Sequence, residues 1–386
     1  MEDLCKWTTA LPKIELHAHL NGCVRWETLS DLASQRGINL SSHLTPTNGN
    51  EQKTPSMLTS KRRNLKDCFE IFDEIHNCVN DTNALRRITR EALKDFAAEQ
   101  VWYLELRSTP RSIFTDLSKG ALCDKRTYIQ TILEEFERFV QSSGASSAPL
   151  IPRLLISIDR SGSVEDAVEN VSLAVEFSRS TGRYSGFVVG VDLGGNPFKN
   201  DVRDFIPALQ MARNAGLKIS AHVGEIPCGT QNDSNPSLKR AYDEAMAVAS
   251  FKPDRIGHAL FVPDDFWTLL NEDPVPVECC PTSNVMTLEL THHEYGNLED
   301  GLRNHPQLSK WLETDYPLSI NTDDPGVFLT NASSEWQMVA NTFHLTKRRL
   351  ADVVLRSSHH IFEPSSVIRT DLVQRLSERI NILCPQ

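Results

Sequence analysis

The sequence predicts an α/β fold, a TIM-type (β/α)8 barrel, and two observations support this prediction. Short apolar runs alternate with helix-like patterns along the whole chain, and nearly every apolar run ends in a polar side chain that could take part in chemistry. In barrels of this type the catalytic residues gather at the carboxyl ends of the strands. A chain of 386 residues is long enough for one such barrel or for two average domains.

Eight short runs rich in β-forming residues make up the predicted barrel. Several of them are almost continuously apolar, which is typical of parallel strands covered on both faces. In order along the chain they span residues 14–19, 101–107, 153–158, 187–193, 217–222, 255–258, 275–280 and 318–322.

Helix-like patterns separate these runs, at residues 84–99, 125–140, 164–178 and 201–215. Between the first and second strands the chain makes an additional excursion. Residues 41–60 are rich in Ser, Thr, Asn and Pro and indicate a loop, and residues 65–78 have a helical pattern. We therefore expect one domain over residues 1–386, in which a loop and additional helices at residues 41–80 lie over the barrel mouth as a possible lid.

The composition excludes several classes of protein. The formal net charge of −11 leaves no basic excess for binding a nucleic-acid backbone. The nine cysteines include no Cys-x-x-Cys pair, which favours reduced thiols in the cytosol. No run is apolar enough for a secretory signal or a membrane span. We expect a cytoplasmic monomer without nucleic-acid or membrane partners.

The first predicted strand ends in His17 and His19, two residues apart and therefore on one face of the strand. Two imidazoles placed in this way can bind a single metal ion. In a closed barrel, His222 and Asp323 would converge on the same point from the fifth and eighth strands. Three nitrogen ligands and one carboxylate suit Zn²⁺, although Co²⁺ or Fe²⁺ could also occupy such a site.

Two further carboxylates lie next to these candidate ligands. Glu225 follows His222 by three residues, a distance that suits a general acid or base beside the metal. Asp324 directly follows Asp323, and neighbouring side chains of an extended chain point to opposite sides. One of the two aspartates can therefore bind the metal while the other holds the nucleophilic water.

The chain resembles the adenosine/AMP deaminase family of zinc hydrolases over essentially its whole length, and most closely the adenosine deaminase-like branch of N6-methyl-AMP deaminases. This resemblance implies a barrel of the metal-dependent hydrolase type. The matching motifs, in family order, are PKIELHAHL at 12–20, VDLGG at 191–195, HVGE at 222–225, RIGH at 255–258, PTSN at 281–284 and TDDP at 322–325.

The resemblance implies specific roles for the strand-end residues. Glu225 would protonate the purine at N1 while a zinc-bound hydroxide attacks C6. His258 would position that hydroxide, Asp324 would hold the same water, and the backbone at Gly195 would contact the purine. One zinc ion per chain would be bound by His17, His19, His222 and Asp323.

Two features of the sequence favour a nucleotide over a nucleoside. Adenosine deaminases proper carry Asp where this chain has Asn21, and a carboxylate there would repel a phosphate by roughly 4 kcal/mol at about 4 Å and an effective dielectric of about 20. The run from Arg107 to Arg111 offers hydroxyls, amides and guanidinium groups for a phosphate. By resemblance, the substrate contacts are His19, Asn21, His76, Ser108, Thr109, Pro110, Arg111, Asp159, Gly195 and Asp324.

Some of these assignments have an ordinary alternative. His76 could equally be a surface or core histidine, and Asp159 could simply end its strand. The remaining histidines, including His305, lie outside the strand ends, and we expect surface or packing roles for them.

The expected reaction is the hydrolysis of N6-methyl-AMP to IMP and methylamine. One alternative is the deamination of adenosine to inosine. Another keeps the barrel and metal but acts on a different amide or a phosphoester. A more distant alternative is an inactive barrel that serves as a binding protein.

Overall fold

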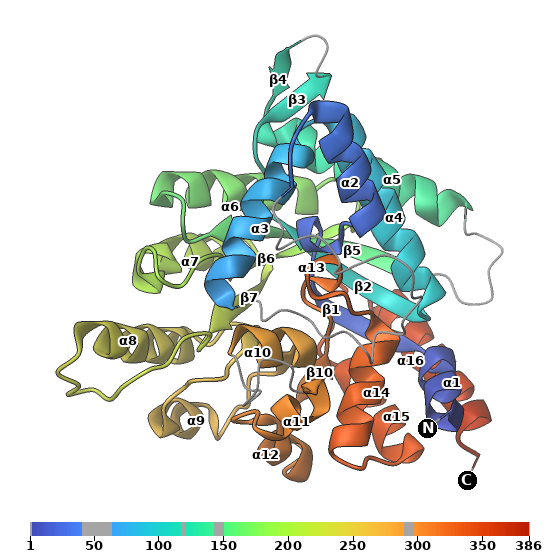
Figure 1. The fold of residues 1–386 in the computed structure, drawn as a ribbon, viewed down its shortest axis with the longest axis vertical. Coiled ribbons are helices and arrows are strands. Elements are labelled where there is room, and N and C mark those ends of the chain that lie inside the picture. Colours follow the sequence, from blue (N-terminus) through green and yellow to red (C-terminus); the bar gives the residue numbers. More distant parts are fainter. Residues whose placement is uncertain (1, 41–63, 117–119, 143–149, 289–296, 386) are drawn as a thin grey trace.

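The computed structural model describes residues 2–40, 64–116, 120–142, 150–288 and 297–385. Its main sheet contains eight parallel strands that form a nearly closed barrel surrounded by helices (Figure 1), which confirms the predicted fold. Hydrogen-bonded neighbours follow chain order: β1 (Lys13–His19), β2 (Val101–Ser108), β5 (Ile151–Asp159), β6 (Val188–Gly194), β7 (Lys218–Val223), β8 (Arg255–His258), β9 (Val277–Cys279) and β10 (Leu318–Ile320).

The barrel closes just beyond the end of β10. Asp323 pairs with Ala18 of β1 in a parallel bridge. Its N–H donates to the carbonyl of His17 at 2.9 Å, and its own carbonyl accepts from the N–H of His19 at 3.0 Å. The closing seam therefore brings Asp323 next to both histidines of the first motif.

The helices pack outside the strands and bury their apolar faces against them. Those that follow the barrel strands are α5 (Lys125–Ser142), α6 (Val164–Ser178), α7 (Ile206–Asn214), α8 (Pro236–Phe251), α9 (Asp264–Leu270), α10 (Pro281–Thr287), α11 (Leu298–Arg303), α12 (Leu308–Glu313), α13 (Pro325–Phe328), α14 (Ala332–Thr342), α15 (Lys347–Ser357) and α16 (Ser366–Leu383). No helix within the described residues is both long enough and apolar enough to cross a membrane.

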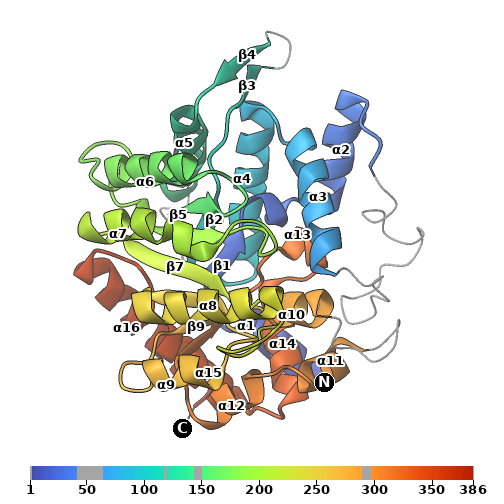
Figure 2. The same ribbon diagram turned by 90° about the vertical axis from the view of Figure 1, so that its left-hand side faces the viewer.

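Additional elements lie at the N-terminus and around the β1–β2 connection (Figure 2). These are α1 (Glu2–Ala10), the short 3₁₀ helix η1 (Asn21–Cys23), α2 (Trp26–Arg36), α3 (Leu65–Cys78) and α4 (Thr82–Ala98). The helix α3 begins with a reciprocal cap, in which the Asn64 side chain accepts from the Asp67 N–H and the Asp67 side chain accepts from the Asn64 N–H. The predicted loop at residues 41–63 lies outside the described residues.

The sequence predicted the long helices better than the short elements. The bounds of α3 and α6 agree with the patterns at 65–78 and 164–178. The pattern at 201–215 is divided into a 3₁₀ turn, η3 (Val202–Phe205), and α7, because Pro207 near the start of α7 lacks an N–H donor. The hairpin of β3 (Ile113–Asp116) and β4 (Ala121–Cys123), which projects from the barrel in both views, was not predicted because its strands are so short.

Candidate active site and metal centre

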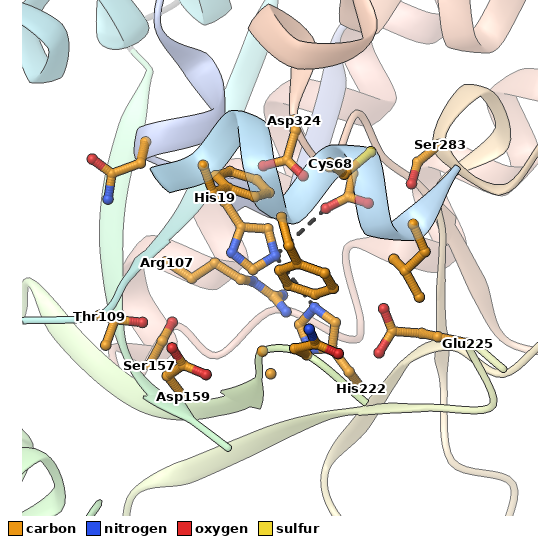
Figure 3. Close-up of a pocket in the computed structure, with 18 of the residues that line it drawn as sticks. His19, Cys68, Arg107, Thr109, Ser157, Asp159, His222, Glu225, Ser283 and Asp324 are labelled. Atoms are coloured by element: carbon orange, nitrogen blue, oxygen red, sulfur yellow. Dashed lines mark hydrogen bonds and ion pairs between the residues drawn. The ribbon is translucent and has the colours of Figure 1, made fainter. Parts of the chain in front are cut away.

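A cavity of about 350 Å³ opens at the carboxyl ends of the barrel strands, within the size range of small-molecule sites. One wall is formed by α3, through Leu65, Cys68, Phe69, Phe72, Asp73 and His76. Figure 3 shows His19, His222, Glu225 and Asp324 pointing toward one another from different elements. The sequence-predicted residues in the cavity wall are His19, Asn21, His76, Ser108, Thr109, Asp159, Gly195, His222, Glu225, His258, Asp323 and Asp324.

The four candidate metal ligands meet at the floor of this cavity. Nε2 of His19 lies 3.2 Å from Nε2 of His222 and 3.5 Å from Oδ1 of Asp323. Nε2 of His17 lies 3.4 Å from the same Asp323 oxygen. Ligand atoms at about 2.0–2.2 Å from a tetrahedral zinc ion stand roughly 3.3–3.6 Å apart, so these separations fit such an ion.

The opposite ring nitrogens of His17 and His222 are held by acceptors. Nδ1 of His17 donates to Oε2 of Glu278 at 2.7 Å, and Nδ1 of His222 donates to the carbonyl of Leu193 at 3.0 Å. Each ring is therefore oriented with Nε2, its remaining candidate ligand atom, toward the cluster. Nε2 of His17 is buried without a hydrogen-bond partner among the described residues, and a cation bound to the cluster would provide one.

The pKa values of two candidate ligands, His19 and His222, move in opposite directions. Burial lowers the pKa of His19 to about 3, so this ring is neutral and ready to coordinate. Burial also acts to lower the pKa of His222, but the Asp192 carboxylate outweighs it and raises the value to about 9. A metal ion that binds His222 must therefore displace a proton.

Two other side chains that could bind a metal, His258 and Cys280, also lie close to the cluster. Nδ1 of His258 lies 3.0 Å from the amide nitrogen of Asn284, which can only donate, so the ring hydrogen is on Nε2 and that atom cannot coordinate. The Cys280 thiol donates to the carbonyl of Glu278, and burial raises its pKa well above the ordinary value. Neither residue offers a free lone pair as readily as His19.

Three ionisable side chains surround the place where a substrate would meet the metal. Nε2 of His258 lies 3.9 Å from Oε1 of Glu225 and 4.0 Å from Oδ2 of Asp323. Burial raises the pKa of Glu225, which favours its protonated form. Burial and the adjacent Asp323 raise the pKa of Asp324 as well, and Oδ1 of Asp324 has no hydrogen-bond partner among the described residues.

Two glycines allow the close approaches that shape this site. A Cβ atom on Gly22 would lie 1.7 Å from Oδ1 of Asp324. A Cβ atom on Gly195 would lie 2.0 Å from Oδ1 of Asp159, and the φ of +92° at Gly195 is one that other residues rarely adopt. Both positions therefore require glycine if the site is to keep its form.

The predicted phosphate-binding residues fall into two groups, those that line the cavity and those that do not. The hydroxyls of Ser108 and Tyr128 lie 2.8 Å apart, and the amide nitrogen of Asn21 lies 3.5 Å from the same tyrosine oxygen. Oδ1 of Asn21 is buried without a partner among the described residues. Asn21 and Ser108 line the cavity and Tyr128 is buried against them, so these three side chains give that corner of the wall a neutral polar character.

Pro110 and Arg111, by contrast, do not line the cavity. The Arg111 guanidinium instead donates to the carbonyl of Val79, at the C-terminal end of α3. Carbonyl groups at a helix end lack intrahelical partners and carry partial negative charge, so they attract the cation. The predicted direct contact of these two residues with substrate is therefore not supported by their placement.

The cavity wall contains a cation that the sequence reasoning missed. Lys199 lies on the loop after β6 and lines the cavity, and its ammonium has no acidic partner among the described residues. No motif singled it out. Arg107 also lines the cavity, but its guanidinium is already paired with Asp192 and Glu278 at 2.8 Å each.

The sequence reasoning also missed Glu278, a fully buried carboxylate beneath the cluster of candidate metal ligands. It accepts hydrogen bonds from His17, from Ser220 at 2.9 Å and from the two guanidinium groups of Arg107 and Arg255. Burial acts to raise the pKa of Glu278, but the two arginines outweigh it and hold this pKa well below its ordinary value. An acid in the middle of an apolar strand was the only signal that could have revealed it.

Replacing Glu278 with glutamine is expected to destabilise both the barrel and the metal site. Two buried guanidinium groups would lose a shared counter-charge, which costs about 3–5 kcal/mol in the free energy of unfolding. His17 would lose its orienting acceptor, which weakens metal binding about 10–100-fold. Chemical denaturation and chelator competition measure these effects. The exposed Glu272 provides a control as Glu272→Gln, and equal behaviour of the two variants would contradict the prediction.

The comparisons with known proteins agree with this geometry. A sequence model described as adenosine deaminase matches residues 12–379. The chain is 36% identical to the N6-mAMP deaminase of Arabidopsis thaliana over 89% of this chain and 90% of that protein. It is 33% identical to the N6-methyl-AMP deaminase of Homo sapiens, over 92% and 90% respectively. A crystal structure of Arabidopsis ADAL complexed with IMP superposes with a TM-score of 0.76 at 31% identity, over 98% and 100% of the two chains.

Proposed function

The chain belongs to the adenosine deaminase family, a group of hydrolases acting on C–N bonds in cyclic amidines, and we propose that its reaction is the hydrolysis of N6-methyl-AMP to IMP and methylamine. One observation carries the proposal. A single cavity is lined by His19, His222 and Asp323, which His17 joins from beneath, by a buried carboxyl group at Glu225 and by a neutral corner around Asn21. The names of the relatives and the IMP complex of a structural neighbour support the same substrate class.

The residues at the cavity floor fit one zinc ion, which would be held by His17, His19, His222 and Asp323. When bound there, the ion would lower the pKa of a coordinated water to about 7 and so provide the nucleophile at neutral pH. The unpartnered Nε2 of His17 supports this assignment.

The remaining residues would handle the protons of the reaction. Burial raises the pKa of Glu225 and so favours its protonated form, and Glu225 would deliver that proton to N1 of the purine as oxygen adds to C6. His258 donates a hydrogen bond from its Nε2–H to the added oxygen, and the carboxyl group of Asp324 accepts a hydrogen bond from the hydrogen on that oxygen. C6 is then tetrahedral. The proton of the C6 hydroxyl then passes to the amine nitrogen, the C6–N bond breaks with its electron pair leaving on methylamine, and the remaining oxygen becomes the C6 carbonyl of IMP.

The substrate assignment is tested with metal-loaded protein and four separate substrates: N6-methyl-AMP, AMP, adenosine and N6-methyladenosine. Chromatography is expected to show IMP from N6-methyl-AMP and little turnover of the two nucleosides. Fast turnover of adenosine would contradict the nucleotide assignment and indicate an adenosine deaminase. Absence of turnover with all four would leave a binding protein or a hydrolase of another substrate.

Metal removal is expected to abolish activity reversibly. Elemental analysis of the purified protein should find one zinc ion per chain, and dialysis against a chelator should remove the ion and the activity together. Adding zinc should restore both. Asp323→Asn should bind zinc more weakly, because a neutral amide oxygen replaces the charged ligand. Full activity of protein shown to be free of metal would refute the assignment.

A further inference from the structure

A chain of buried hydrogen bonds runs from the candidate catalytic histidine His258 away from the cavity. Nδ1 of His258 lies 3.0 Å from the amide nitrogen of Asn284 on α10. The amide oxygen of Asn284 lies 3.2 Å from Nε2 of His305, just before α12. All three side chains are buried, and His305, to which the sequence assigned only a surface or packing role, is 5% exposed.

The direction of each hydrogen bond follows from the last link of this chain. Nδ1 of His305 lies 3.2 Å from the backbone nitrogen of Gln307 and 3.0 Å from that of Leu308. A backbone N–H can only donate, so Nδ1 of His305 must be an acceptor. Burial lowers the pKa of His305 to about 3, so the ring is neutral and carries its one hydrogen on Nε2.

This hydrogen sets the orientation of the next group. Because Nε2–H of His305 donates, the atom of Asn284 that faces it must be the amide oxygen. The NH2 group of Asn284 then faces His258, and Nδ1 of His258 must accept from it. A flipped amide would place its NH2 group against the Nε2–H of His305, two donors facing each other, so the network permits one arrangement.

We propose that His305 is a positioning residue that acts through Asn284 to hold His258 in the tautomer with its hydrogen on Nε2. This inference rests on the proposed function for its catalytic consequence. Nε2 of His258 faces Glu225 and Asp323 across the cavity floor. In the other tautomer, His258 would present a lone pair to the incoming oxygen and repel it, a type of fault that can cost on the order of 10²–10⁴ in rate.

A purely structural role for His305 is the competing explanation. Its ring packs edge-on against Trp311 at a centroid distance of 5.7 Å, and its Nδ1 satisfies two backbone donors at the start of α12. The two ring nitrogens have different tasks, however, and can be tested separately. The amide of asparagine can imitate Nδ1, whereas the longer glutamine can place a donor where Nε2 lies.

Two variants at this position form a matched pair. His305→Asn keeps the acceptor for the backbone but loses the donor to Asn284, and we expect kcat to fall at least tenfold with little change in KM or melting temperature. His305→Gln keeps the donor to Asn284, and we expect kcat within about threefold of wild type even if the melting temperature falls. The reverse order of kcat in the two variants would overturn the proposal.

A third variant changes the network from its centre. Asn284→Asp keeps the shape of the side chain but offers only acceptors, so it favours hydrogen on Nδ1 of His258. We expect kcat to fall by about 10²–10⁴ while the zinc content stays at one ion per chain. Unchanged kcat in a zinc-replete Asn284→Asp protein would contradict the proposal.

The tautomer itself can be observed in metal-loaded protein without substrate. Nitrogen NMR of protein labelled with ¹⁵N-histidine distinguishes the two forms, and loss of a signal in His258→Gln assigns it. Hydrogen on Nε2 is expected in wild type and His305→Gln, and a shift toward Nδ1 in His305→Asn and Asn284→Asp. If these shifts occur in a protein that hydrolyses none of the four substrates, the proposed function fails but the positioning role stands. If wild type is active and His305→Asn changes neither tautomer nor kcat, the positioning role is refuted.

Discussion

Replacing Glu225 with glutamine is expected to lower kcat for N6-methyl-AMP by about 10²–10⁴-fold without loss of the metal. Glutamine has nearly the same shape and can still donate a hydrogen bond toward N1. It cannot deliver a proton to N1, however, so the ring stays a poor acceptor of electrons when oxygen adds to C6. Steady-state kinetics and elemental analysis of the same preparation measure the two quantities together.

The interpretation of this variant depends on its zinc content and its fold. We expect one zinc ion per chain and a KM close to wild type, because Glu225 is not among the candidate ligands. Glu272→Gln, at an exposed position, is the matched control and should keep full activity. A Glu225→Gln protein with zinc bound and kcat within a few-fold of wild type would show that N1 is protonated by another group.

Changing Asn21 to aspartate is expected to make the enzyme prefer N6-methyladenosine over N6-methyl-AMP, because only the latter carries a phosphate. The Asn21 side chain is 7% exposed, its Oδ1 has no hydrogen-bond partner among the described residues, and it lies in the neutral corner beside Tyr128. A carboxylate about 4 Å from a phosphate would cost roughly 4 kcal/mol at an effective dielectric of about 20, or about 10³-fold in kcat/KM. For N6-methyladenosine, which has no phosphate, we expect little change.

This prediction is checked by measuring kcat/KM for both substrates with wild type and Asn21→Asp. Asn21→Ser is a useful control, because it removes the amide without adding charge. Asn21→Ser should lower kcat/KM by a similar factor for both substrates, and by less than Asn21→Asp lowers it for N6-methyl-AMP. Equal losses on the two substrates in Asn21→Asp would show that Asn21 does not lie near the phosphate.

The fold could be predicted from the sequence because parallel barrel strands are apolar and end in polar residues. Each of the eight predicted runs overlaps an observed strand, and the bounds differ by at most a few residues. The strands β3 and β4 could not be found in this way. They are short and lie away from the barrel, so they carry no continuous apolar signal.

The structure brings His17, His19, His222 and Asp323 together because the carboxyl ends of strands that are far apart in the sequence meet at one mouth when the barrel closes. Sequence spacing could not show which side chains already have partners. Arg111 looked available for a phosphate, but its guanidinium donates to the carbonyl of Val79, which has no partner within the helix. Glu278 and His305 were missed because their partners, His17 and Asn284, are distant in sequence, so no local pattern marked them as part of the site.

The most direct test of the proposed reaction is a competition between N6-methyl-AMP and N6-methyladenosine in one solution with zinc-loaded protein. The two compounds differ only in the phosphate, and both yield methylamine on hydrolysis. We predict that IMP accumulates together with an equal amount of methylamine while N6-methyladenosine remains. Formation of inosine at a comparable rate, or no IMP at all, would contradict the assignment of this chain as an N6-methyl-AMP deaminase.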